Sequence, residues 1–121
     1  MRVLVLADDL IWSTRLVAQV QSAGADSVTV RSVAALDAAL PGADAVIVDL
    51  TARAYDGIEA IRRASAAGRR VLAVGQHDDA ELRRRALAAG AEWVHPYRKL
   101  FDRGPEALVA WLNPEVEARA R

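Results

Sequence analysis

The chain lacks several residue types on which common functions depend. Its 121 residues include no cysteine, which excludes disulfides, thiolate zinc sites and thiol nucleophiles. The two histidines, His77 and His95, lie far apart and do not have the spacing of metal ligands, so we expect no histidine metal site. Lysine occurs once, at Lys99, so any mechanism that requires a lysine has one candidate.

An excess of charge and a long apolar run are also absent. Sixteen basic and sixteen acidic residues give a formal net charge of zero, which argues against broad electrostatic binding to nucleic acid or to an anionic membrane. No apolar run approaches the ~18 residues of a membrane span, and the first ten residues do not have the layout of a signal peptide. We therefore expect a cytoplasmic protein with no direct nucleic-acid contact and no membrane contact.

Short apolar runs alternate with segments of helical periodicity. The hydrophobic fraction of 53% is enough for one well-packed domain. Strands are predicted at 3–6, 27–31, 45–48, 71–74 and 93–94, and helices at about 10–23, 32–40, 57–68, 78–90 and 105–112. This alternation predicts a doubly wound, five-stranded parallel sheet in the order 2-1-3-4-5, with five flanking helices in a three-layer α/β/α arrangement. The domain is predicted to span 1–113, followed by a short charged tail at 114–121. The initial methionine and this tail favour a stand-alone domain.

Three carboxylates follow strands that are neighbours in this sheet. Asp8 and Asp9 come after the first strand, and Asp49 ends the third. In a doubly wound sheet, binding sites form beyond the carboxyl ends of the strands, where the strand order reverses. Crowded carboxylates repel one another unless a cation neutralises them, and hard oxygen ligands favour Mg²⁺ over zinc. An aspartate beside Mg²⁺ can attack a phosphoryl group. The simpler interpretation of Asp8 and Asp9 is a helix N-cap.

Several spacings agree with one known family when they are taken together. Asp49 lies eight residues before Gly57, which follows Asp56 as a "D-G" pair. Residues 88–91 read AAGA before the fifth strand, and residues 99–102 read KLFD. Over about residues 2–112 the sequence resembles the receiver domain of two-component response regulators. The order of these features along the whole chain carries the resemblance more than any one of them.

The resemblance assigns roles to particular residues. It implies that Asp49 is the phosphoacceptor and that Asp8 is the principal acid that binds Mg²⁺. The first acid of the family's pair falls on Ala7, so Asp9 would have to replace it from one position later. The backbone carbonyl of Thr51 would be a further metal ligand, beside Asp49 itself.

The departures from the family pattern are as informative as the matches. The position of the family's switch Ser/Thr falls on Gly75, which has no hydroxyl. A count without gaps from Gly90 places Tyr97 at the position of the conserved lysine, whereas matching KLFD to the family's KPFD places Lys99 there. Both alignments stay open at this point, as does a cis peptide bond between His95 and Pro96.

These departures resemble atypical or pseudo-receivers, which act as binding modules. The leading hypothesis is a two-component-type signalling module that acts through protein–protein contacts with weak or no dependence on phosphorylation. Its partner would be a histidine kinase or an output protein, or a second copy bound through the face of the fourth helix, fifth strand and fifth helix. Trp93, Tyr97 and Phe101 gather there and fit either an interface or the edge of the core.

Two alternatives remain. The first is a functional Mg²⁺-dependent phosphoacceptor modified on Asp49, whose enzymatic activity would be at most slow self-phosphorylation and dephosphorylation. The second, more remote, is a small-ligand-binding protein of flavodoxin-like topology. Residues 7–9 (ADD) contain no glycine to cradle a phosphate, and their acids would repel an anionic cofactor.

Overall fold

The chain folds around a single parallel sheet. The computed structural model describes residues 1–75, 79–102 and 105–113. The strands lie in the order β2-β1-β3-β4-β5, which confirms the predicted order. Their bounds are β1 (Arg2–Leu6), β2 (Asp26–Val30), β3 (Ala45–Asp49), β4 (Arg70–Gly75) and β5 (Trp93–Pro96). The helices are α1 (Leu10–Ser22), α2 (Val33–Ala39), α3 (Gly57–Ala66), α4 (Ala80–Ala89), α5 (Tyr97–Asp102) and α6 (Glu106–Leu112), with a 3-10 turn at Leu40–Gly42.

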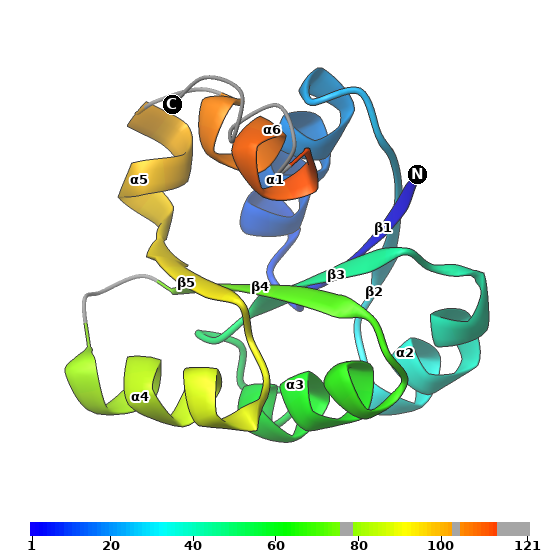
Figure 1. Cartoon of the computed structure of the whole chain (residues 1–121), viewed down its shortest axis with the longest axis vertical. Helices are drawn as coiled ribbons and strands as arrows, with labels where there is room; N and C mark the ends of the chain where they lie inside the picture. The colour runs from blue at the N-terminus through cyan, green and yellow to red at the C-terminus, as the bar shows by residue number, and fades with distance from the viewer. Residues whose placement is uncertain (76–78, 103–104, 114–121) are drawn as a thin grey trace.

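Helices cover both faces of the sheet, so the domain has the predicted three layers. Figure 1 shows α1, α5 and α6 on one face and α2, α3 and α4 on the other. Strands β1, β3 and β4 lie inside the sheet and are buried on both sides, which is why their sequences are almost continuously apolar. Alternate residues of each strand face opposite helical layers: Leu4 packs toward α2 and α3, and Val5 toward α1 and α6.

Polar residues define where the helices begin. Asp9 caps α1 by accepting a hydrogen bond from the Trp12 backbone N–H at 3.0 Å, and Asp56 caps α3 through the N–H groups of Ile58 and Glu59. Gly90 ends α4 with a positive φ of 122°, and a Cβ at this position would collide with Ser65 of α3. The close packing of α3 against α4 therefore depends on glycine at position 90.

The chain after β4 differs in detail from the prediction. The fifth strand extends to Pro96, and a short helix, α5, begins at the next residue, so the described residues contain six α-helices rather than five. Tyr97 and Leu100 are both buried, because one helical turn places them on the face toward the sheet. The bond between His95 and Pro96 is trans, as are all described peptide bonds. His77 and the tail at 114–121 lie outside the described residues.

No helix in the described part of the chain combines the length and the apolar character needed to cross a membrane.

Candidate functional site

The ends of β1 and β3 lie side by side at one edge of the sheet. Leu6 pairs with Val48 in the parallel register, so Asp8 and Asp49 leave the sheet at the same edge, as predicted. Asp49 pairs in turn with Val74 of β4. The loop between β3 and α3, residues 50–56, covers this edge. The candidate site is therefore the region where the carboxyl ends of three neighbouring strands meet, which we call the Asp49 crevice.

The Asp49 carboxylate is almost completely enclosed. The residue is 1% exposed, and its Oδ1 accepts hydrogen bonds from both the N–H and the hydroxyl of Thr51, at 2.9 and 2.7 Å. Its Oδ2 is buried and has no hydrogen-bond partner among residues 1–75, 79–102 and 105–113. An unpaired buried carboxylate oxygen is costly, so this atom marks the place where a further group would gain most by binding.

Tyr97 reaches the same carboxylate through Thr51. Its hydroxyl oxygen lies 3.0 Å from the Thr51 hydroxyl oxygen. Because the one hydroxyl proton of Thr51 is donated to Asp49, Tyr97 is the donor in this contact. The Tyr97 ring stacks on Trp12 of α1, with centroids 4.1 Å apart and planes 2° apart. Burial, and after it the adjacent Asp49 carboxylate, raise the pKa of Tyr97 above its ordinary value, so the hydroxyl keeps its proton at neutral pH.

A second tyrosine, Tyr55, joins the two strand ends from the loop side. Its hydroxyl lies within hydrogen-bonding distance of the backbone carbonyls of Leu6, at 2.9 Å, and of Asp49, at 2.7 Å. Burial, followed by the negative charges of Asp49 and Asp8, raises the pKa of Tyr55. The side chain is therefore a neutral donor at physiological pH. It ties the loop to both strands of the crevice.

The two acids after β1 have separate structural tasks. Asp9 is exposed and caps α1. Asp8 Oδ2 accepts hydrogen bonds from the backbone N–H groups of Arg53 and Ala54, at 3.0 and 3.1 Å, and so holds the loop beside β1. Among the described residues, no three acidic or histidine side chains gather closely enough to hold a metal ion. The Mg²⁺ site at Asp8, Asp9, Asp49 and the Thr51 carbonyl stays a prediction; in this structure the Asp8 and Asp9 carboxylates bond backbone N–H groups.

Comparison with known proteins gives one consistent result. No protein-family model matches the chain, and no curated protein gives a significant match. Among solved structures, the signal receiver domain of a DNA-binding response regulator from Colwellia psychrerythraea superposes with a TM-score of 0.79 at 20% identity, over 97% of this chain and 98% of that one. A CheY-like receiver domain protein from Methanospirillum hungatei gives a TM-score of 0.77 at 15% identity, with coverages of 98% and 95%.

A response regulator from Burkholderia pseudomallei, solved with a phosphorylated aspartic acid, a calcium ion and citrate, gives a TM-score of 0.77 at 17% identity, over 98% of this chain and 72% of that one. The chain has the receiver fold. The resemblance seen in the sequence and the predicted fold class are thereby confirmed.

Two positions that were assigned by sequence counting, Gly75 and Tyr97, can now be located in the receiver fold. Gly75 ends β4 next to the crevice, is buried, and pairs with Pro96 of β5. It has no side chain to offer a ligand bound at Asp49. Tyr97, as the count without gaps indicated, lies beside Asp49 and Thr51.

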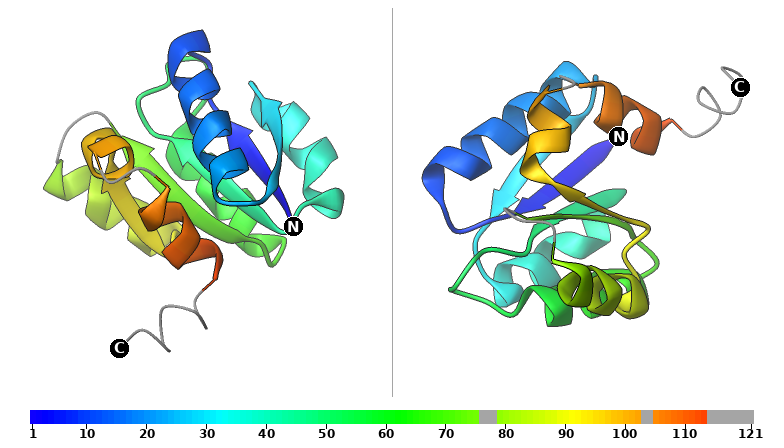
Figure 2. Two further views of the ribbon diagram at one scale, coloured as in Figure 1. Left: turned by 90° about the horizontal axis from the view of Figure 1, so that it is seen from above. Right: turned by 90° about the vertical axis from the view of Figure 1, so that its left-hand side faces the viewer.

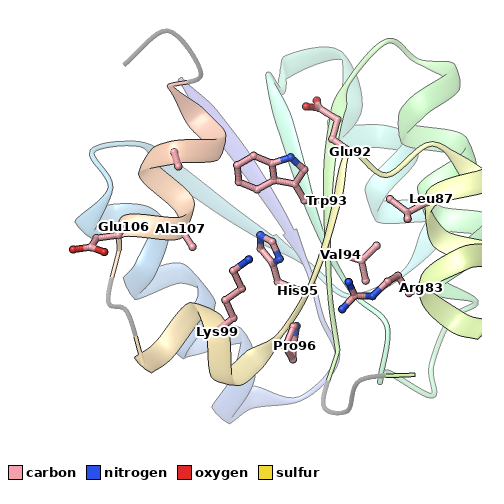
Figure 3. Close-up of a pocket in the computed structure, with 11 residues that line it drawn as sticks. Arg83, Leu87, Glu92, Trp93, Val94, His95, Pro96, Lys99, Glu106 and Ala107 are labelled. Atoms are coloured by element: carbon pink, nitrogen blue, oxygen red, sulfur yellow. The ribbon is translucent and has the colours of Figure 1, made fainter. Parts of the chain in front are cut away.

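Lys99 lies elsewhere in the receiver fold. It is exposed on α5 and lines a pocket of about 610 Å³ on the outer side of β5. We call this the β5 pocket; it is lined mainly by Arg83 and Leu87 of α4, residues 92–96, Lys99, and Glu106 of α6. Figure 3 shows the Lys99 ammonium turned toward the ring of His95. Burial, and after it the positive charge of Lys99, lowers the pKa of His95 to about 4.

Sequence reasoning missed the parts of the site that depend on side-chain direction. It assigned only the backbone carbonyl of Thr51, whereas the hydroxyl of that residue bonds Asp49. It gave no role to Tyr55 or to the ring of Trp12. A tyrosine inside a short polar loop is the one signal that could have drawn attention to Tyr55, because an aromatic ring there needs a packing partner.

Proposed function

We propose that this chain is a two-component-type signalling module that acts through protein–protein interaction, with weak or no dependence on phosphorylation. The observation that carries this proposal is the chain of contacts from Asp49 through Thr51 to Tyr97. These contacts place the neutral Tyr97 hydroxyl on the side of the crevice where the resemblance implies a lysine. The partner would be a histidine kinase, an output protein or a second copy of the chain.

Charge balance supports the proposal. A phosphoryl group on Asp49 would bring about two negative charges into a crevice that already contains the Asp8 carboxylate. Transfer of such a group is normally assisted by cations that neutralise the developing charge. Here Lys99 lies in the β5 pocket, Asp9 caps a helix, and Tyr97 supplies no charge. Phosphorylation of Asp49 is therefore expected to be slow.

The absence of a hydroxyl at Gly75 affects the step after phosphorylation, in which the signal passes from Asp49 to the partner surface. If a phosphoryl group did form, a side chain at the end of β4 would have to bind it and shift to pass the signal on. Glycine offers no such side chain. Coupling between Asp49 and the face formed by α4, β5 and α6, which is the predicted fifth helix, is thus expected to be weak, and partner binding through that face remains part of the proposal.

The main alternative is a functional Mg²⁺-dependent phosphoacceptor. The Oδ2 of Asp49 favours it, because no hydrogen bond in the described structure occupies the lone pairs with which this oxygen would attack a phosphoryl group. The structural relative from Burkholderia pseudomallei carries a phosphorylated aspartic acid. In this alternative, Asp8, Asp9 and the Thr51 carbonyl would have to rearrange to hold the metal ion.

Intact-mass spectrometry separates the two functions. The protein is incubated with Mg²⁺ and acetyl phosphate, beside a receiver known to phosphorylate under the same conditions. We expect no stable phosphoryl adduct on this chain. An adduct that disappears in Asp49→Asn would overturn the proposal and establish the phosphoacceptor. Asp49→Asn is a suitable control because asparagine is nearly the same size and keeps the Oδ1 acceptor for Thr51.

A further inference from the structure

The β5 pocket is separate from the Asp49 crevice and has the size of a ligand site. It opens along the outer side of the edge strand β5, between α4 and α6 (Figure 3). Its volume of about 610 Å³ lies within the ~300–1,000 Å³ typical of small-molecule pockets. The consecutive elements α4, β5, α5 and α6 contribute to its walls, so the pocket depends on how the chain after β4 packs around the edge of the sheet.

Positive charge faces this pocket from both sides of β5. Within residues 1–75, 79–102 and 105–113, Lys99 forms no ion pair. Arg83 of α4 adds a second positive charge on the other side of the strand. The acids at the rim do not neutralise Lys99. Glu92 pairs with Arg70 at 2.7 Å, and Figure 3 shows the carboxylates of Glu92 and Glu106 pointing away from the Lys99 ammonium.

The rest of the lining is apolar and partly uncovered. Trp93 is half-buried, with its ring centroid 5.4 Å from that of His95. Leu87 at the α4 rim is 45% exposed. Val94 and Pro96 complete the apolar wall. An indole on the same side of β5 as an ammonium without an ion pair favours a ligand that has one anionic end and a flat apolar body.

We propose that the β5 pocket binds a small organic carboxylate, whose carboxylate pairs with Lys99 and whose flat apolar part lies against Trp93. The expected contact is a charge-assisted hydrogen bond from the ammonium to the carboxylate, made stronger by partial exclusion of water.

The dimensions of β5 favour a small molecule over an added peptide strand. An extended peptide binds an edge strand chiefly through main-chain hydrogen bonds. The β5 strand has four residues and ends in Pro96, which has no N–H to donate. It therefore offers few groups to a sixth strand. His95, whose pKa is lowered, is neutral at physiological pH and can form a hydrogen bond with the ligand without adding charge.

Titration with 2-naphthoate, followed by amide NMR shifts, tests the proposal. We expect saturable shifts at β5, at Lys99 and at Leu87, and weaker binding of 2-naphthamide, which is nearly the same shape but uncharged. Lys99→Met should weaken naphthoate binding about tenfold, which corresponds to the loss of one charge-assisted hydrogen bond. Arg98→Met is the matched control, because Arg98 is on the same helix but is 88% exposed, pairs with Asp102 and does not line the pocket.

Each unfavourable result is decisive. Equal affinity for the acid and the amide, equal affinity of Lys99→Met and Arg98→Met, or shifts that map outside the β5 pocket would each overturn the proposal. Both substitutions are at exposed positions, and the same spectra report whether the fold is intact. The proposal is independent of the phosphorylation state, so Asp49→Asn should bind naphthoate as the unmodified protein does. Failure here would leave the proposed function of the Asp49 crevice untouched.

Discussion

The position of one hydroxyl group decides how the Asp49 crevice can work. Tyr97 donates to Thr51, and Thr51 donates to Asp49, so the two hydroxyls form a relay that ends on a buried carboxylate. The stacked ring of Trp12 keeps the Tyr97 ring in place. Both tyrosines near the crevice remain protonated at neutral pH, and the described groups that bond or approach Asp49 there are neutral donors.

Removing the Tyr97 hydroxyl tests this relay at a single atom. Tyr97→Phe keeps the stack on Trp12 but leaves Thr51 without its donor. We expect the free energy of unfolding to fall by about 0.5–1.5 kcal/mol, the usual net contribution of one hydrogen bond. Urea unfolding measures the change. Thr51→Val combined with Tyr97→Phe completes a double-mutant cycle, and strictly additive effects would contradict the coupling between the two hydroxyls.

At the scale of single elements, the N-terminus of α1 distinguishes two roles of Asp9, helix cap and metal ligand. As a helix cap, Asp9 needs a side-chain acceptor, and asparagine provides it as well as aspartate does. As a metal ligand it needs its negative charge. The structure supports the cap.

We therefore predict different outcomes for two substitutions at position 9. Asp9→Ala should lower the free energy of unfolding by about 1 kcal/mol, and Asp9→Asn by much less, because asparagine restores the acceptor for the Trp12 N–H. Thermal unfolding with and without Mg²⁺ gives the measurement. Mg²⁺-dependent stabilisation that is present in the wild type and lost in Asp9→Asn would show that the carboxylate binds metal instead.

The elements also show which parts of the structure the sequence could predict. Strands β1, β3 and β4 were predictable because burial on both faces requires continuous apolar runs. Helix α5 was not, because six residues with Tyr97 and Leu100 inward give less than two turns of periodicity. Counting could not decide between Tyr97 and Lys99. Residues two apart on a helix lie about 200° apart around its axis, so only the rotation of α5 places one at Asp49 and the other in the β5 pocket.

The location of the crevice was predictable for a topological reason, and its chemistry was less so. Asp8 and Asp49 follow neighbouring parallel strands, so the sheet order alone brings them to one edge. The partners of their carboxylates depend on the path of the loop at 50–56. No periodic pattern specifies that Asp8 holds the N–H groups of Arg53 and Ala54 or that Tyr55 joins two carbonyls.

At the scale of the whole molecule, His95 makes stability depend on pH. Burial and the charge of Lys99 lower its pKa from 6.5 to about 4, so the unfolded chain binds a proton at this residue more readily than the folded chain does. This contribution to stability is complete above pH 6.5 and decreases as the pH falls toward 4. The groups with charge around the ring are Lys99 and Arg83, with Glu92 and Glu106 at the rim of the β5 pocket.

We predict that His95→Gln flattens this part of the pH dependence. Between pH 7 and pH 5, the wild type should lose about 1 kcal/mol more stability than the variant, a value reduced from the full pKa shift because the ring is partly in contact with solvent. Urea unfolding at the two pH values measures the difference. The contribution of the carboxylates to the pH dependence cancels in the comparison because both proteins contain the same carboxylates. Identical slopes would contradict the lowered pKa of His95.

The order of the strands also affects how copies of the chain meet at high concentration. The three most apolar strands are enclosed by β2 on one side and β5 on the other, as the views in Figure 2 show. Fibril-like stacking generally starts from six or seven consecutive residues of high β-propensity. The two outer strands have five and four residues, and the second ends in proline. Segments able to template aggregation therefore stay inside the sheet until the molecule unfolds, and resistance to aggregation should follow global stability rather than surface composition.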